Sequence, residues 1–176
     1  TQIDPADRRR HIGYLPQDIA LFYGTLRDNL NLEGAALSDE ELFEALDGVG
    51  LGAWVRSHPL GLDMPIQGNA SLSGGQRQAV GLVRVLVQDP PIVLLDEPTS
   101  SFDQTSEKQV VDYLQQWLTG RTLILVTHKK VMLSLVERAV VMRQGRVIMD
   151  GALDQVVQDN VVSAPQEPRG GNHAVQ

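Results

Sequence analysis

The sequence predicts an α/β fold built on a mostly parallel sheet, and two observations carry that prediction. Short runs of consecutive apolar residues, such as residues 92–95, are typical of parallel strands buried on both faces. Longer segments, such as residues 104–118, place apolar residues three and four positions apart, as helices do. The two kinds of segment follow one another as strand, helix, strand, the order of βαβ units. With 176 residues, of which 42% are hydrophobic, the chain can bury one sizeable core.

The first half of the chain is expected to be mostly helical. Pro16 ends an apolar run that predicts a strand. Ser38 and Glu41 have the spacing of a capping box, in which each residue bonds to the backbone of the other at a helix start. The expected elements are a strand over residues 11–15, a turn and short helix over 24–29, a helix from residue 38 with Leu42, Phe43, Leu46 and Val49 on one face, and a helix over 50–57.

The second half alternates helices and strands and ends in a hairpin. Gln144 and Gly145 separate two apolar runs and predict the hairpin turn. The residues from Ser163 onward are rich in proline and glycine, so we expect a disordered tail. The expected elements are a helix over residues 76–88, buried strands over 92–95 and 122–126, a helix over 104–118 between them, and hairpin strands over 140–142 and 146–149.

The composition disfavours several classes of function. A formal net charge of −7 disfavours non-specific binding of nucleic acid, which needs a basic face. The sequence has no cysteine, so disulfides and thiolate metal sites are excluded. No apolar run approaches the roughly 18 residues that a membrane helix needs. Any membrane role must therefore come from another segment or another chain.

Residues 72–76, LSGGQ, form a small glycine-bearing loop at the start of a predicted helix. The first N–H groups of a helix lack partners within it and lie at the positive end of its dipole, so they favour a phosphate. Gly74 and Gly75 would let that backbone approach closely. Taken alone, Ser73 with two glycines is more often a plain turn capped by serine. The longer run through Gln76 is much more specific.

Asp96 and Glu97 follow a buried strand, at the end where open α/β sheets bind ligands. Two neighbouring carboxylates repel one another unless a cation or distinct roles separate them. An aspartate in a magnesium shell and a glutamate that activates water as a base meet that need. The alternative is a solvated strand end before a turn at Pro98, which the LSGGQ run upstream disfavours.

Three further residues are weak signals alone and gain weight from their order around these motifs. His128 follows the strand over residues 122–126 and could contact a γ-phosphate, although a lone histidine is more often structural. Gln17 could bind magnesium or orient water, although alone it is merely a turn residue. Asp103 could serve the same site or simply cap the helix that begins at Gln104.

As a set, these motifs resemble those of the ATP-binding cassette (ABC) ATPases, over roughly residues 3–158. The matching segments are Gln17 for the Q-loop, residues 72–76 for the signature, 92–96 for the Walker B strand, Glu97 for the catalytic glutamate, 100–103 for the D-loop and 127–128 for the H-loop. The lysine-bearing phosphate loop, G-x-x-x-x-G-K-[ST], does not occur in the sequence. We therefore expect a preceding segment to supply it, and we expect the 176 residues alone to be inactive.

The resemblance implies the fold, the domain bounds and the site. It implies a P-loop NTPase-like ABC ATPase core over residues 1–162, lacking its N-terminal part, with a helical subdomain over about 18–88 and a tail over 163–176. ATP and Mg²⁺ are the implied cofactors. The implied roles are catalysis for Glu97 and His128, magnesium binding for Asp96 and Gln17, and nucleotide binding for Gln17, Ser73, Gly74, Gly75, Gln76 and Asp103.

The resemblance also implies partners. In this family two nucleotide-binding domains pair head to tail, so the signature would contact ATP held by a second copy, and closure drives attached membrane domains. Residues 13–18 and 21–30 look like those of exporters, and residues 58–63, HPLGLD, are similar to bacterial type I secretion ATPases. We expect a transmembrane domain in the same full-length chain, a secreted protein substrate, no nucleic acid, and a place at the cytoplasmic face of the inner membrane.

Three alternatives remain open at this point. The chain could belong to another ABC exporter that moves a lipid, peptide or drug. It could be a head domain of DNA maintenance, which should show coiled-coil heptads and a basic face; the sequence has neither. It could also be a remnant without enzyme activity, because the phosphate loop does not occur in it.

Overall fold

The computed structural model describes residue 4, residues 10–32 and residues 34–162, and only the backbone of residues 159–162. The chain divides into two compact units, Thr1–Leu135 and Val136–Gln176, which are described separately below. The predicted disordered tail lies outside the described residues. The domain bounds expected from the sequence, with a helical subdomain over about residues 18–88, stay a prediction.

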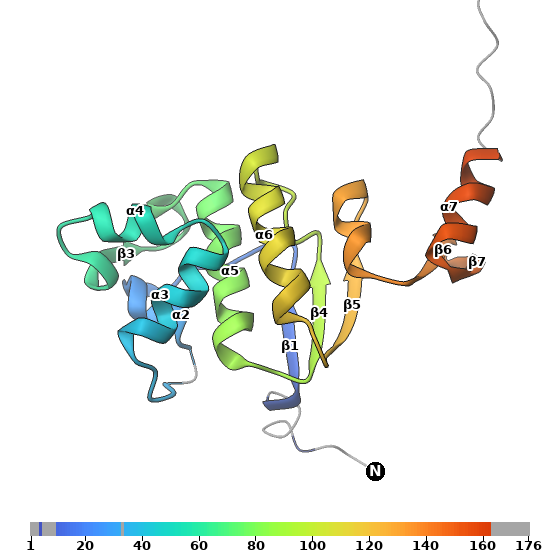
Figure 1. The fold of residues 1–176 in the computed structure, drawn as a ribbon. Coiled ribbons are helices and arrows are strands. Elements are labelled where there is room, and N and C mark those ends of the chain that lie inside the picture. The colour runs from blue at the N-terminus through green and yellow to red at the C-terminus, as the bar shows by residue number, and fades with distance from the viewer. Residues whose placement is uncertain (1–3, 5–9, 33, 163–176) are drawn as a thin grey trace, which may run out of the picture. The chain divides into compact units, whose positions relative to one another are not determined.

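A three-stranded parallel sheet organises the first unit (Figure 1), with strand order β1-β4-β5. Leu15 pairs with Leu95, which pairs in turn with Leu125, so the carboxyl ends of all three strands meet at one edge. The parallel α/β fold expected from the sequence is thus confirmed. The strands are β1 (Ile12–Leu15), β4 (Ile92–Asp96) and β5 (Thr122–Val126).

The strand predicted over residues 122–126 is present, but the prediction that it is buried is wrong. Ile124 is 54% exposed and Val126 is 56% exposed, and Tyr14 of β1 is exposed on the same sheet. Leu95 and Val93 of β4 instead belong to the buried core. The reason is that β5 is an edge strand and that, within the described residues, one face of the sheet packs on the core while the other leaves apolar side chains in solvent.

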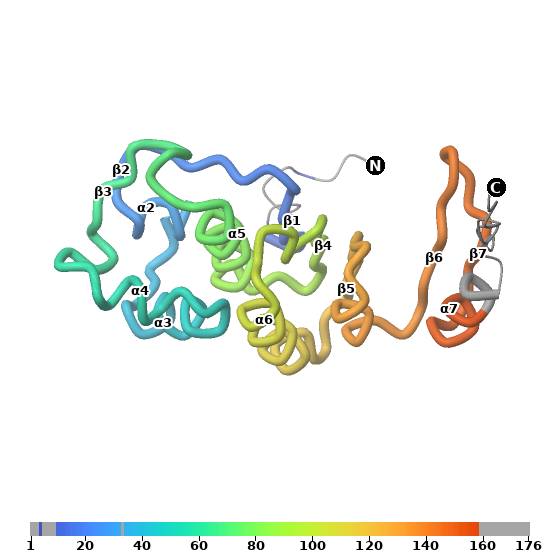
Figure 2. Tube along the Cα trace, turned by 90° about the horizontal axis from the view of Figure 1, so that it is seen from above, coloured from blue at the N-terminus to red at the C-terminus, as the bar shows by residue number. Residues whose placement is uncertain are grey.

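Two long helices pack beside this sheet. Figure 2 shows α6 (Gln104–Trp117) on one side of the strands, next to α5 (Gly74–Gln88). α5 begins two residues before its predicted start because Ser73, rather than a later residue, caps it. Eight of its 15 residues are buried, and Val80 and Val83 are completely enclosed. The end of α5 therefore positions the loop that precedes β4.

Shorter helices extend the first unit beyond α5. The capping box predicted at Ser38 is present, with its hydroxyl accepting from the Glu41 N–H and the Glu41 carboxylate accepting from the Ser38 N–H. The strand pair β2–β3 was not expected, because its strands have three residues each and lie about forty positions apart in the sequence. The elements are β2 (Tyr23–Thr25), α2 (Leu26–Leu30), α3 (Asp39–Gly48), α4 (Gly52–Ser57), η1 (Gly61–Asp63), β3 (Pro65–Gln67), η2 (Asn69–Ser71) and η3 (Lys130–Leu135).

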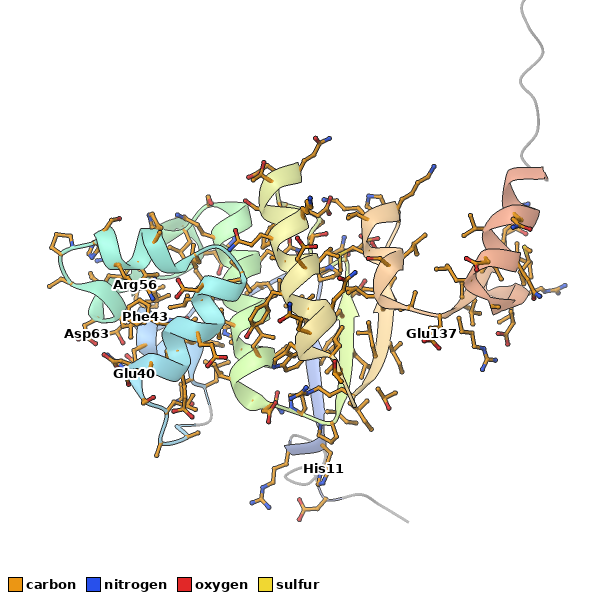
Figure 3. All side chains as sticks on the ribbon, viewed as in Figure 1. His11, Glu40, Phe43, Arg56, Asp63 and Glu137 are labelled. Carbon is orange, nitrogen blue, oxygen red and sulfur yellow. The ribbon has the colours of Figure 1, made fainter. Side chains whose placement is uncertain are left out.

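Helices α3 and α4 are tied together by one arginine. Arg56 donates to both carboxylate oxygens of Asp47, at 2.6 and 2.7 Å. Its guanidinium also lies over the Phe43 ring, 4.4 Å from the ring centre (Figure 3). Planar pairing and stacking of this kind are specific to arginine. The contact fixes the short α4 against α3.

The second unit consists of a hairpin and one helix, and the predicted hairpin is confirmed. Gln144 and Gly145 both have positive φ, 51° and 73°, as the tight turn between twisted strands requires. Arg138 pairs with Asp150 across the strands. Within the described residues, no helix is long and apolar enough to cross a membrane. The elements are β6 (Arg138–Arg143), β7 (Arg146–Ala152) and α7 (Leu153–Val162).

Candidate functional site

The candidate site forms where the three parallel strands end. Gln17 lies two residues after Leu15, and Glu97 lies two residues after Leu95, which pairs with Leu15. His128 lies two residues after the last residue of β5. Ligands of open α/β sheets bind at this carboxyl edge. The strand register therefore brings three predicted site residues to the same edge of the sheet.

Glu97 and His128 form a direct pair. The His128 Nδ1 atom lies 2.8 Å from Glu97 Oε1. The Glu97 side chain is 16% exposed, whereas His128 is 74% exposed. The other carboxylate oxygen, Glu97 Oε2, is buried and has no hydrogen-bond partner. A buried carboxylate oxygen without a partner is unusual, so it is available to a group that binds from outside the chain.

The backbone of Glu97 is held in an uncommon conformation. Its φ is 48°, in the left-handed region that non-glycine residues rarely adopt. The Glu97 N–H donates to the Val126 carbonyl at 2.9 Å, and the Glu97 carbonyl accepts from the Ser100 N–H at 3.2 Å. Conformations of this kind persist only where surrounding bonds fix them. These bonds fix the backbone that carries the Glu97 carboxylate.

Asp96 and Gln17 offer oxygen atoms of the kind that magnesium prefers. Asp96 is half-buried at the end of β4, and exposed Gln17 lines a cavity of about 240 Å³ with Gly74 and Gln78. Within residues 10–32 and 34–162 no three His, Cys, Asp or Glu residues form a group that could hold a metal ion. Mg²⁺ usually keeps several waters and takes one or two protein ligands plus phosphates. The orphaned Glu97 Oε2 nearby fits the same chemistry, so these residues suit an ion brought with a nucleotide.

The LSGGQ loop is a capped helix start, as its simpler interpretation proposed. The Ser73 hydroxyl accepts from the Gln76 N–H at 3.2 Å, and the Ser73 N–H donates to Gln76 Oε1 at 2.9 Å. The sequence analysis did not identify this capping box, although the Ser-x-x-Gln spacing indicates one. The Ser73 hydroxyl hydrogen and the N–H groups of the first turn at Gly74 and Gly75 stay available to a phosphate.

Gln78 is a site residue that the sequence analysis missed. It is 3% exposed, and its amide nitrogen donates to the Glu97 carbonyl at 2.7 Å and to the Ser100 hydroxyl at 2.9 Å. Its amide oxygen accepts from the Ser101 N–H at 2.7 Å. The signal that could have found it is a polar residue among apolar ones on the buried face of α5.

Asp103 caps α6, as one of its two sequence interpretations proposed. Its Oδ1 atom accepts from the N–H groups of Thr105 and Ser106, both at 2.9 Å, and Oδ2 accepts from the Ser106 hydroxyl. The bonds from Ser106 lower the pKa of the Asp103 carboxyl. The carboxylate is exposed but committed to these donors, so a contact with nucleotide stays a prediction.

A second polar cluster fixes the segment that carries His128. The Lys129 ammonium donates to the Thr99 carbonyl at 2.6 Å and pairs with Glu107 of α6 at 2.8 Å. The Thr99 hydroxyl donates to the same Glu107 oxygen at 2.5 Å. Burial raises the pKa of Glu107, but the bonds from Lys129 and Thr99 outweigh that effect and lower it overall. Lys129, which follows His128, is thus bonded to Thr99, which lies two residues after Glu97.

The candidate site combines a parallel α/β core, a Glu97–His128 pair at the carboxyl edge of its sheet and a capped glycine loop. Open α/β sheets bind nucleotides at this edge, so the fold and the site are of the class of nucleotide-binding domains. Residues 1–100 match the family described as ABC transporter, and the chain belongs to that family. A relative from Neisseria meningitidis serogroup A, an ATP-dependent lipid A-core flippase, is 37% identical over 153 residues. This alignment covers 86% of the chain and 25% of the relative.

Two other relatives agree with this assignment. The glutathione/L-cysteine transport system ATP-binding/permease protein CydC of Escherichia coli K12 is 38% identical, over 85% of this chain and 26% of that protein. A bacterial Atm1-family ABC exporter solved with ATP bound superposes with a TM-score of 0.82 and 28% identity, over 88% of this chain and 28% of the other. The chain therefore spans about a quarter of the length of these relatives and matches the ATP-binding domain of exporters.

Proposed function

We propose that this chain is part of the nucleotide-binding domain of an ABC exporter, and that the full-length protein binds and hydrolyses ATP with it. The observation that carries the proposal is the pair of Glu97 and His128, with Glu97 Oε2 buried and unpartnered at the carboxyl edge of the sheet. The names of the relatives, which are a flippase, a transport protein and an exporter, support the transport role.

In this proposal Glu97 is the general base. Its free Oε2 atom accepts a proton from the attacking water, while Oε1 keeps its bond to His128. The exposed His128 ring contacts the γ-phosphate and orients Glu97. Asp96 and Gln17 hold Mg²⁺, which neutralises charge on the phosphates when it is bound. The phosphate loop is supplied by a preceding segment of the full-length chain.

The signature loop serves a second copy in this proposal. Ser73, Gly74 and Gly75 present a hydroxyl hydrogen and first-turn N–H groups, which bind the γ-phosphate of ATP held by the partner. Gln76 stabilises this loop through the capping box, and Asp103 keeps the neighbouring α6 start in place. The functional unit is thus a homodimer, and each subunit carries its own transmembrane domain with the ATPase on the cytoplasmic face of the inner membrane.

The transported substrate that we propose is a secreted polypeptide, as in type I secretion. Support comes from residues 58–63, HPLGLD, and from the exporter-like residues 21–30. A lipid is the second candidate, because the Neisseria relative at 37% identity is a lipid A-core flippase. ATP is hydrolysed at the same site in either case.

The test uses the full-length protein in liposomes. ATP hydrolysis should be magnesium-dependent and should fall about 100-fold in Glu97→Gln, the scale of general-base loss. A repeat-containing secreted polypeptide should stimulate the wild-type rate, and lipid A should not. Stimulation by lipid A alone would replace the polypeptide with a lipid as the proposed substrate. Undiminished hydrolysis in Glu97→Gln would overturn the assignment of Glu97 as the base.

A further inference from the structure

Helix α5 and the backbone of Glu97 are joined through one buried side chain. Gln78 lies five residues after Ser73, in the second turn of α5, and is 3% exposed. Its nitrogen donates to the Glu97 carbonyl at 2.7 Å and its oxygen accepts from the Ser101 N–H at 2.7 Å. A single amide therefore contacts both the residue proposed as the base and the loop that follows it.

The chemistry of the contact requires an amide of this length. The Gln78 nitrogen donates twice, to the Glu97 carbonyl and the Ser100 hydroxyl, while its oxygen accepts once. A glutamate would keep the acceptor and lose both donors, and a methionine of similar volume would lose all three bonds. Buried polar groups left without partners are costly, so either change must alter the loop.

The residue before Gln78 fixes the start of α5 to the segment that precedes it. Arg77 donates to the carbonyls of Asn69 and Leu72, at 3.0 and 2.8 Å. A Cβ atom added to Gly75 would meet the Ser101 carbonyl oxygen at 3.1 Å, so the helix start and the loop after Glu97 are already close. A displacement of the signature loop would therefore move Gln78 together with the loop at Ser100 and Ser101, to which Gln78 is bonded.

Glu97 is sensitive to such a displacement because its own backbone is constrained. Its φ of 48° is maintained by bonds to its N–H and its carbonyl, and Gln78 supplies the shortest bond to that carbonyl. A shift of the carbonyl would rotate the peptide and carry the carboxylate with it. Catalytic geometry is sensitive to displacements of this size, about 1 Å costing roughly 100-fold in rate.

We propose that Gln78 is a positioning residue that holds Glu97 in its active geometry and links it to the signature loop of the same chain. The inference rests on the proposed function, since it assigns Glu97 as the base. When the signature loop contacts the partner's nucleotide, Gln78 would therefore transmit the resulting displacement to Glu97 of its own subunit. Gln78 itself touches neither nucleotide nor water in this proposal.

The test uses full-length heterodimers in which one subunit carries Glu97→Gln, so that only the other subunit's site hydrolyses ATP. Gln78→Met is placed either in the subunit with the active base or in the subunit with Glu97→Gln. In the first position kcat should fall about tenfold or more, with little change in the KM for ATP. In the second position kcat should stay within about twofold of the reference heterodimer, whose Gln78 is intact.

Two further variants keep the test decisive. Gln78→Glu preserves the shape and the acceptor, and it should lower kcat in the same subunit if Gln78→Met does not fold. Val83→Ala, in the buried face of the same helix, controls for loss of stability and should leave kcat near the reference. The role of Gln78 would be overturned if kcat fell equally with the Gln78 substitution in either subunit, or fell only with it in the subunit that carries Glu97→Gln. It would also be overturned if kcat did not fall at all. A homodimer of Glu97→Gln that hydrolyses ATP normally would instead refute the proposed base, independently of Gln78.

Discussion

The Nδ1 atom of His128 lies 2.8 Å from Oε1 of Glu97, so two residues from separate strand ends form one pair. The pair leaves Glu97 Oε2 as the only buried side-chain polar atom without a partner within the described residues. The histidine is largely exposed and the glutamate largely covered. The arrangement orients a carboxylate whose second oxygen is free to accept a proton.

Replacing Glu97 by glutamine in the full-length protein should preserve ATP binding and lower turnover about 100-fold, because the amide keeps the shape and loses the basicity. ATP that is bound but not hydrolysed should stabilise the dimer. Steady-state hydrolysis and size-exclusion chromatography with ATP measure the two effects. Asp112→Asn, the same chemical change at an exposed position of α6, is the control and should retain the wild-type rate. Wild-type turnover in Glu97→Gln would make His128 the better candidate for the base.

Glu107→Gln should destabilise the fold by about 1–3 kcal/mol, because it leaves Lys129 without its charged partner in a mostly buried position. The lowered pKa of Glu107 means that its contribution is present above its ordinary value of 4.5 and is lost as the pH falls through the lower folded value. The difference between wild type and variant should therefore be constant near neutral pH and shrink in acid. Urea unfolding at several pH values measures it.

The matched control for this prediction is Glu44→Gln, an exposed glutamate of α3. Its effect on the free energy of unfolding should stay within about 0.5 kcal/mol, as is usual for surface substitutions. If Glu107→Gln were equally mild, or if its effect did not change with pH, the pair with Lys129 would contribute no stability.

The sequence was sufficient to predict the parallel core and the edge at which the candidate residues gather. Consecutive apolar residues predicted β4 and β5, and their register places Glu97 and His128 together as expected. The capping box at Ser38 and the turn at Gln144 and Gly145 depend on local chemistry, which a sequence displays directly. Predictions that rest on neighbours in sequence were therefore the most accurate.

The features that the sequence did not predict depend on residues that are close in space but distant in the chain. The exposure of Ile124 follows from which faces of the sheet are covered, and an apolar run does not report that. The pairing of β2 with β3 joins short segments with no strong pattern. The bonds of Gln78 connect residues about twenty positions apart, so nothing at residue 78 alone indicates Glu97 as its partner.

The 176-residue chain should bind ATP weakly and show no measurable hydrolysis. Phosphate loops hold the β- and γ-phosphates with several N–H groups and a lysine, and no G-x-x-x-x-G-K-[ST] motif occurs in these residues. Isothermal calorimetry with ATP and Mg²⁺ measures the affinity. Binding near the micromolar range would show that the principal nucleotide site is built from other residues of this chain.

Ser73→Arg in the full-length protein should block closure and hydrolysis while leaving initial ATP binding nearly intact. The arginine would place a bulky cation at a helix start where the backbone must approach a phosphate, and it would remove the serine of the capping box. Ser73→Thr keeps the hydroxyl that caps the helix and is the matched control, which should retain most of the activity. Nucleotide trapping and the rate of hydrolysis together measure the effect.

A mixed dimer shows which nucleotide the signature contacts. One subunit carries Ser73→Arg, and the other carries a substitution of the phosphate-loop lysine that we expect in a preceding segment of the full-length protein. If the signature acts on the partner's nucleotide, both lesions fall on one composite site and the second site stays whole. If it acts within its own subunit, each site has one lesion and neither can close. Trapping of nucleotide at one site per dimer is the expected result. Loss of trapping at both sites would contradict the head-to-tail arrangement, and trapping is scored beside turnover because coupling between sites can lower the rate alone.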